Sequence, residues 1–196
     1  MLVYRLLILL DQGIFNDLTQ GLKQRITETF ANIIVKVEFK SIRLIELGVS
    51  CWNSNRNQYD ANSLLSKIVE DATSDEIANR QSNVTDLEIA DITPSILPLT
   101  LLLTPADCYD RKLNFVFGLA KYKVGAVVST FRLENSQAFV SKECIHELGH
   151  VFGLKHCKLP CVMTFSNSVL EADEKSSKFC SSCYEQINDQ IKTDPH

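Results

Sequence analysis

The amino-acid sequence predicts an α/β fold (α+β in the broader sense) in a single domain covering residues 1–196, and two features of its pattern support this. The chain opens in the order strand, helix, strand, which favours a sheet whose first strands are parallel. Further on, three short apolar runs with turn signals between them precede a long helical pattern. With 196 residues, 45% of them apolar, the chain can enclose one substantial hydrophobic core.

The first two strands and the helix between them follow from apolar spacing. Residues 3–10 read as a buried strand rather than a secretory signal peptide, because Arg5 interrupts the apolar run and no small-residue cleavage site follows it. From Ile14 to Phe30 apolar residues recur at every fourth position, which indicates an amphipathic helix. Residues 33–40 then alternate, so one face of the second strand is expected to carry Val35, Val37 and Phe39.

The remaining elements are expected in the following order. The stretch 51–63, rich in asparagine and serine, is expected to be a loop that leads into a helix beginning near Asp60, and the polar stretch 73–86 is expected on the surface. That helix turns inward Leu64, Leu65, Ile68 and Val69. Strands are expected within 95–104, 113–120 and 125–133, and helices over 138–152 and 183–192.

Charge and hydropathy argue against two classes of partner. The net charge is −4, the isoelectric point is near 5.6, and the basic residues are scattered, so nucleic-acid binding is not indicated. No segment has the eighteen or more apolar residues of a membrane-spanning helix, so no membrane association is expected. These features and the cysteine usage favour a cytoplasmic protein, and they leave the oligomeric state open.

Three of the four histidines lie within the stretch ECIHELGHVFGLKHCKLPC, spaced H-E-x-x-H-x-x-G-x-x-H. Residues four apart on a helix share one face, so His146 and His150 can present two imidazoles to one metal ion. Glu147 would stand beside that ion rather than on it. Gly153 would end the helix in a left-handed conformation and return the chain, so that His156 becomes the third ligand.

Three imidazoles with one open position are typical of a catalytic zinc site. Such a zinc ion would lower the pKa of its bound water and polarise a substrate carbonyl, while Glu147 would act as general base and then as acid to the leaving amine. The motif therefore predicts a zinc-dependent metallopeptidase that hydrolyses peptide bonds in a peptide or protein substrate. Histidines that hold a metal without turning over a substrate remain an alternative.

Four of the seven cysteines form two close pairs, Cys157 with Cys161 and Cys180 with Cys183. Paired thiols that are separated by about eighteen residues match a four-cysteine structural zinc site, in which the ion closes the intervening loop. We therefore expect a second zinc ion and a small C-terminal subdomain over 157–196. The remaining cysteines, Cys51, Cys108 and Cys144, are expected to be reduced, buried thiols.

With these motifs taken together, the sequence resembles the metzincin zinc peptidases and, among them, closely resembles the archaemetzincins. The resemblance rests on the histidine motif, a following cysteine, a C-x-M and a later C-x-x-C, which are His146, Glu147, His150, Gly153, His156, Cys157, Cys161, Met163, Cys180 and Cys183. Weaker similarity extends to NRNQYDA, TPADCYDRKLNFVFGLA and STFRL. One departure is that the first cysteine pair encloses three residues, whereas the family usually has four.

The resemblance implies a compact metzincin-like fold, with a twisted, mostly parallel sheet packed on two main helices and the second of these carrying the first two zinc ligands. It implies that Met163 lies in a turn beneath the catalytic zinc without binding it. It also implies that LNFVFG lies near an edge strand, against which an extended peptide could pair. Aminopeptidase activity has been ascribed to some family members.

Two other functions use the same residues. A non-catalytic two-zinc binding or scaffold protein would hold both ions without turnover, and it would have no need of a carboxylate at Glu147. A zinc hydrolase that cleaves a non-peptide amide would use the same three histidines, so only its substrates would distinguish it from a peptidase.

Overall fold

A five-stranded sheet forms the centre of the protein, for which a computed structural model describes residues 4–14, 16–82, 98–111, 113–133, 136–166 and 168–193. Four strands are mutually parallel, and the fifth runs antiparallel at one edge, so the expected mostly parallel sheet is confirmed. In spatial order the strands are β2 (Ile34–Ile42), β1 (Tyr4–Asp11), β5 (Leu99–Thr104), β8 (Gly125–Ser129) and the antiparallel β7 (Gly118–Lys121).

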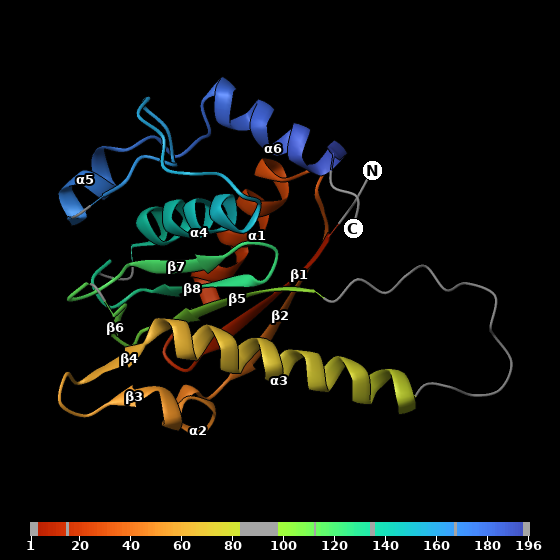
Figure 1. Ribbon diagram of the computed structural model, residues 1–196, viewed down its shortest axis with the longest axis vertical. Helices are drawn as coiled ribbons and strands as arrows, with labels where there is room; N and C mark the ends of the chain where they lie inside the picture. Colours follow the sequence, from red (N-terminus) through yellow and green to blue (C-terminus); the bar gives the residue numbers. More distant parts are fainter. Residues whose placement is uncertain are drawn as a thin grey trace, which may run out of the picture.

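Helices cover both faces of this sheet (Figure 1). One face carries α1 (Asn16–Thr29) and α4 (Gln137–Val151), and α6 (Ser181–Thr193) lies beyond them on the side away from the sheet. The opposite face carries the long helix α3 (Ala61–Ser82). Alternation along each strand divides the apolar side chains between the two faces, because successive strand residues point in opposite directions.

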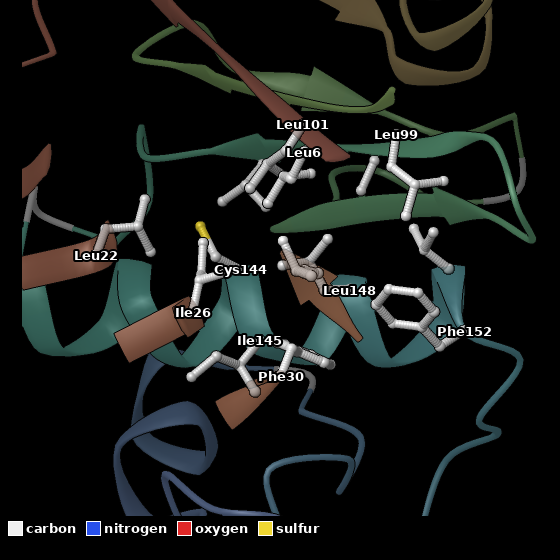
Figure 2. Packing of buried hydrophobic residues seen from close by; sticks show 14 of the residues in the cluster. Leu6, Leu22, Ile26, Phe30, Leu99, Leu101, Cys144, Ile145, Leu148 and Phe152 are labelled. Atoms are coloured by element: carbon white, nitrogen blue, oxygen red, sulfur yellow. The ribbon is translucent and has the colours of Figure 1, made fainter. Parts of the chain in front are cut away.

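The core between α1, α4 and the sheet holds α4 in place (Figure 2). Leu22 and Ile26 of α1 are fully buried against α4, as the four-residue spacing predicts. Cys144 and Leu148 of α4 are also fully buried in this cluster. Burying a leucine side chain contributes roughly 2 kcal/mol. The inner side of α4 is therefore fixed by packing, while the histidines occupy another side of the same helix.

One prediction for β2 is wrong. Val35 is 61% exposed, whereas Val37 is 8% exposed, so the two do not share a buried face. The pairing of β1 with β2 shifts between Tyr4 and Arg5, which leaves Val35 without a partner in the register. This irregularity is a β-bulge, and the extra residue turns its side chain out of the alternating pattern.

The stretch 51–63, expected to be a loop, contributes two of the three strands of a small second sheet. This sheet follows α2 (Leu44–Leu47) and a 3₁₀ turn (Val49–Cys51), and its strands are β3 (Trp52–Asn53), β4 (Gln58–Asp60) and β6 (Cys108–Tyr109). Strands of two or three residues carry too little periodicity to be recognised in a sequence. The thiols of Cys51 and Cys108 are buried, as expected.

Several boundaries differ from the expected ones. The apolar run 113–120 forms strand only from Gly118 onward, and the run 125–133 leaves the sheet after Ser129. The expected surface stretch 73–86 is helical as far as Ser82, and residues 83–97 lie outside the described part of the chain. A short helix that was not predicted, α5 (Val169–Glu174), lies between the two cysteine pairs. Across the described residues, every helix is too short or too polar to cross a membrane.

Candidate active site

Helix α4 places two of the three motif histidines one turn apart. His146 and His150 belong to its last two turns, and His156 follows on an extended segment. Each of the three rings offers one nitrogen, and these atoms lie within 4.8 Å of one another. The ring centroids are 4.7 Å apart for His146 and His150 and 4.8 Å apart for His150 and His156. The structure therefore brings together all three predicted ligands.

Hydrogen bonds to the backbone set the orientation of two of these rings. The Nδ1 atom of His146 lies 2.9 Å from the carbonyl oxygen of Val162, and that of His150 lies 2.7 Å from the carbonyl oxygen of Leu154. A carbonyl only accepts, so each Nδ1 carries the proton and each Nε2 presents a lone pair. The two Nε2 atoms face each other at 3.2 Å. Two lone pairs at that distance suit a shared cation, which is the arrangement that metal-binding histidines require.

Gly153 ends α4 as predicted, with φ of +86°. The amide of Leu154 donates to the carbonyl of Gly149 at 2.9 Å, and the amide of Gly153 donates to that of His150 at 2.9 Å. This pair of bonds is a Schellman motif, which needs a left-handed residue at the position of Gly153. The turn directs the chain back toward the helix, and His156 thereby meets the other two rings.

Glu147 lies at the inner wall of the site and is 4% exposed. A Cβ atom placed on Gly118 of β7 would lie 2.5 Å from both Cγ and Oε1 of Glu147, so the glutamate packs directly on the edge strand. Burial, together with the charge of Glu143, raises the pKa of Glu147 well above its usual range. Burial also lowers the pKa of His146 to about 4, which keeps that ring neutral and available as a ligand.

A buried ion pair adjoins Glu147. The ammonium of Lys175 lies 3.1 Å from Oε2 of Glu143, and the two side chains are 2% and 7% exposed. Oxygen atoms of Glu143 and Glu147 and a nitrogen of His146 lie within 4.8 Å of one another. Burial raises the pKa of Glu143, but the neighbouring His146 and Lys175 outweigh that effect and lower it below its usual value. Lys175 is thus the counter-charge to a pair of carboxyl groups.

Met163 lies in a turn against α4 and is fully buried. The nearest atom to a Cβ placed on Gly149 would be Sδ of Met163, so the absence of a side chain at Gly149 lets the methionine approach the helix between the two histidines. The residue before it, Val162, supplies the carbonyl that orients His146. The turn and the histidine are therefore linked by a direct hydrogen bond.

The four paired cysteines form a second cluster, with one sulfur from each of Cys157, Cys161, Cys180 and Cys183 within 4.8 Å of the others. Sγ of Cys157 lies 3.8 Å from that of Cys180, so these two are thiols rather than a disulfide. Hydrogen bonding from the backbone of Cys183 lowers the pKa of Cys180 to about 7. The shortened spacer, with three residues between the first pair, still brings Cys161 into the group.

A cleft of about 400 Å³ opens in front of the histidines. One wall is the segment 113–120 leading into and along β7, and the other is α4. Phe165 lies 4.8 Å from the ring of His156, measured between ring centroids, and forms part of the rim. The charged residues that line the cleft are Asp110, Glu143, Glu147 and Lys175. The three rings and the carboxyl group of Glu147 therefore face the same cleft.

Sequence reasoning missed Glu143, Lys175 and Phe165. Glu143 had a detectable signal, because it lies one helical turn before Glu147 and so shares its face. Lys175 and Phe165 had none, because their contacts with the site depend on how the segment after His156 folds back.

Comparison with known proteins agrees with this geometry. Residues 14–189 match the model of peptidase family M54. An archaemetzincin from Archaeoglobus fulgidus is 33% identical over 169 residues, which cover 82% of this chain and 89% of that protein. An archaemetzincin from Nanoarchaeum equitans is 54% identical over 89 residues. That second match spans 45% of this chain and only about half of the relative, 52%.

Solved structures show the same fold. The crystal structure of archaemetzincin from Methanopyrus kandleri has a TM-score of 0.74 and 31% identity, covering 97% of this chain and 96% of that one. A zinc-dependent peptidase from Methanocorpusculum labreanum also has a TM-score of 0.74, with 27% identity, and covers 93% of this chain and 100% of the other. The family model, the relatives and the structures therefore indicate a single family.

Proposed function

Because the chain belongs to peptidase family M54, the archaemetzincins, which are zinc metallopeptidases, we propose that its cleft hydrolyses peptide bonds, with zinc held by His146, His150 and His156. The observation that carries the proposal is the grouping of three ligand nitrogens within 4.8 Å beside the carboxyl group of Glu147. Neutral imidazoles with their Nε2 atoms free are the donor set that zinc prefers. When bound there, zinc would polarise the scissile carbonyl and acidify a water molecule.

Glu147 is the general base in this proposal. Its carboxylate takes a proton from the attacking water and later delivers it to the leaving amine. An oxygen of Glu147 lies within 4.8 Å of a ring nitrogen of His146, which places the carboxyl group beside the water that a bound zinc would acidify. Contact with Gly118 keeps the carboxylate at the β7 edge, where an extended substrate could pair with the strand.

Zinc at the four-cysteine cluster is the second part of the proposal, giving two ions per chain. Four soft thiolates whose sulfur atoms lie within 4.8 Å of one another favour zinc over the hard divalent cations. Its role is structural, because four protein ligands leave no open position. Met163 does not bind either ion in this proposal and instead packs beneath the histidines.

The third part concerns the end of the substrate. Apart from Glu147 and the buried pair of Glu143 with Lys175, the cleft is lined by the acidic side chain of Asp110, which could attract the positive α-amine of a peptide, and on this basis we propose aminopeptidase activity. A free peptide and its N-acetylated form, equal in sequence, should separate the possibilities. Cleavage of the free form alone supports an aminopeptidase, whereas equal cleavage of both refutes that part of the proposal.

The whole proposal is tested with wild type and Glu147→Gln, measured for zinc content and for hydrolysis of a mixed peptide library. Two zinc ions in each protein and cleavage by wild type alone are the expected results. Glu185→Gln, an exposed change on α6, is the matched control and should cleave like wild type. Equal turnover by Glu147→Gln would refute its role as base. Two zinc ions without cleavage in either protein would favour the scaffold function.

A further inference from the structure

The wall of the cleft opposite α4 has little regular structure of its own. Residues 113–117 line the cleft just before the edge strand β7, and within them only Val116 forms a bridge, with Cys108. The carbonyl of Phe117 accepts a bond of 2.8 Å from the amide of Ser129, and the amide of Leu113 donates to the carbonyl of Asp110 at 2.9 Å. A segment with so few backbone bonds depends on side chains for its position.

Two side chains from outside the cleft hold its backbone. Nη2 of Arg56 donates to the carbonyl oxygens of Leu113 and Asn114 at 3.3 and 3.0 Å. Nε2 of Gln58 donates to the carbonyl of Asn114 at 3.0 Å. Arg56 also bonds Oε1 of Gln58 at 3.0 Å, so the two residues act together.

A third side chain holds an aromatic ring of the same wall. The guanidinium carbon of Arg132 lies 4.2 Å from the ring centroid of Phe115, and the rings of Phe115 and Phe117 meet edge to face at 5.3 Å. An arginine plane over an aromatic ring is attractive and fixes the tilt of the ring. Arg132, which does not line the cleft, therefore holds the ring of Phe115, which does.

Asp107 joins these supports. Its two carboxylate oxygens accept from Nε and Nη2 of Arg132 at 3.0 and 2.8 Å, a bidentate pair. Oδ2 also accepts from Nε2 of Gln58 at 2.9 Å, and the Asp107 side chain is 11% exposed. One carboxylate thus connects the residue that holds the Phe115 ring to the residue that holds the Asn114 carbonyl.

The four residues that hold this segment lie outside the histidine and cysteine motifs, in the three stretches of weaker similarity to the family. Arg56 and Gln58 lie in NRNQYDA, Asp107 lies in TPADCYDRKLNFVFGLA, and Arg132 lies in STFRL. None of the four lines the cleft itself.

We propose that Asp107 and Arg132 are positioning residues, which hold the segment 113–117 as the substrate-binding wall of the cleft without touching the reacting atoms. The proposal rests on the peptidase function and deepens it, because it assigns substrate binding to the segment 113–117, whose position depends on side chains outside the cleft. Loss of the contacts made by Asp107 and Arg132 should weaken the binding of peptide and leave the metal sites unchanged.

The test compares Arg132→Ala, Arg132→Lys and Asp107→Asn with wild type. Lysine keeps the charge but lacks the planar fork that binds Asp107 in two places and lies flat on Phe115, so its effect should be intermediate. The expected result for Arg132→Ala is a KM increased about tenfold, a kcat changed less than about threefold and an unchanged zinc content. Arg43→Ala, which removes an exposed arginine paired with Glu46, is the control and should change neither constant.

Two measurements do not depend on turnover. Hydrogen–deuterium exchange of a fragment containing residues 113–117 should be accelerated roughly tenfold in Arg132→Ala and little in Arg43→Ala. Binding of an uncleaved peptide should be weakened by the same factor as KM when Arg132→Ala is combined with Glu147→Gln. Unchanged exchange would overturn the proposal whatever the activity. Faster exchange with unchanged peptide binding would overturn the link to substrate. Absence of turnover in wild type would refute the proposed function alone.

Discussion

The ammonium of Lys175 lies 3.1 Å from the carboxylate of Glu143, and both side chains are almost completely buried. The two residues come from different parts of the site, since Glu143 belongs to α4 and Lys175 follows α5 in the stretch between the cysteine pairs. Lys142, one position before Glu143, donates to the carbonyl of Asp173 at 2.6 Å. Helix α4 and the segment between the cysteine pairs are therefore joined by an ion pair and a hydrogen bond as well as by packing.

Removing one partner of this pair should be costly. Lys175→Met leaves Glu143 buried without a counter-charge, and such losses typically cost about 3 to 5 kcal/mol of unfolding free energy. The double variant Lys175→Met with Glu143→Gln removes both charges and should recover much of the loss. Urea denaturation of the zinc-loaded proteins measures both values. A cost below about 1 kcal/mol, or a double variant no better than the single one, would contradict this account.

The control is a lysine in an exposed pair. Lys67 lies 3.5 Å from Glu70, and these side chains are 42% and 72% exposed. Lys67→Met should cost less than about 0.5 kcal/mol, because water screens an exposed pair. The contrast between the two lysines isolates the effect of burial.

Gly118→Ala should impair catalysis more than stability. The new methyl group would overlap Cγ and Oε1 of Glu147, so the carboxylate must move away from the β7 edge. A displacement of about 1 Å in a catalytic group can lower the rate by up to roughly 100-fold. We therefore expect kcat to fall at least about tenfold with zinc content unchanged, as measured by peptide hydrolysis and elemental analysis.

Gly21→Ala on α1 is the matched control for that change. Its methyl group would meet only the side-chain amide of Gln137, which can move aside. Activity like that of wild type is expected. If Gly118→Ala were equally active, the contact between Glu147 and the edge strand would have no role in placing the base.

The free energy of unfolding of the metal-free protein should decrease as the pH is lowered through a defined range. Burial depresses the folded-state pKa of His146 to about 4, whereas the unfolded value is near 6.5. A depressed pKa means that folding favours the neutral ring. Its contribution is fully present above about pH 6.5 and is lost as the pH falls toward 4, by up to roughly 3 kcal/mol in all.

Urea denaturation at several pH values, after removal of metal by a chelator, tests this expectation. His146→Asn lacks the titrating ring, so its stability should depend less on pH over the same range. Parallel curves for the two proteins would show that protonation of His146 does not couple to unfolding. The comparison with His146→Asn is needed to isolate the contribution of His146, because burial also lowers the pKa of His150 and His156.

The sequence predicted the catalytic helix and its histidines because a helix converts fixed spacing into fixed geometry. His146 and His150 are four apart, and Gly153 has no side chain to resist the left-handed turn that returns His156. The prediction for Val35 failed because a bulge has no signature in an alternating pattern.

Features that depend on tertiary contacts could not be predicted. Lys175 is 32 residues from Glu143, and nothing in the local sequence indicates that the two meet. Asp107 and Arg132 are 25 residues apart in the sequence. They belong to two stretches that show only weak similarity to the archaemetzincins, and that similarity does not indicate a contact between them. Each follows one of the neighbouring strands β5 and β8, and the chain beyond these strands is joined by bonds from the amide of Thr130 to the carbonyl of Thr104 and from the hydroxyl of Ser129 to the carbonyl of Ala106.

Cys180→Ser tests whether residues 157–196 form a zinc-dependent subdomain, as we propose. Cys180 directly precedes α6, where backbone hydrogen bonding lowers the pKa of its thiol to about 7 and so favours the thiolate that zinc requires. A hydroxyl is a much weaker ligand, so we expect the zinc content to fall by about one ion per chain, with a lower thermal midpoint.

The matched control is Cys51→Ser, a buried cysteine outside both clusters, which should keep the full zinc content even if it lowers stability. Cys157 directly follows His156, and its amide bonds the carbonyl of Met163 at 2.9 Å. Loss of the cysteine site should therefore also loosen the third histidine and weaken zinc retention at the catalytic site during dialysis against a chelator. Full zinc content in Cys180→Ser would exclude this residue as a ligand. Loss of one ion with unchanged retention of the other would show that the two sites are independent.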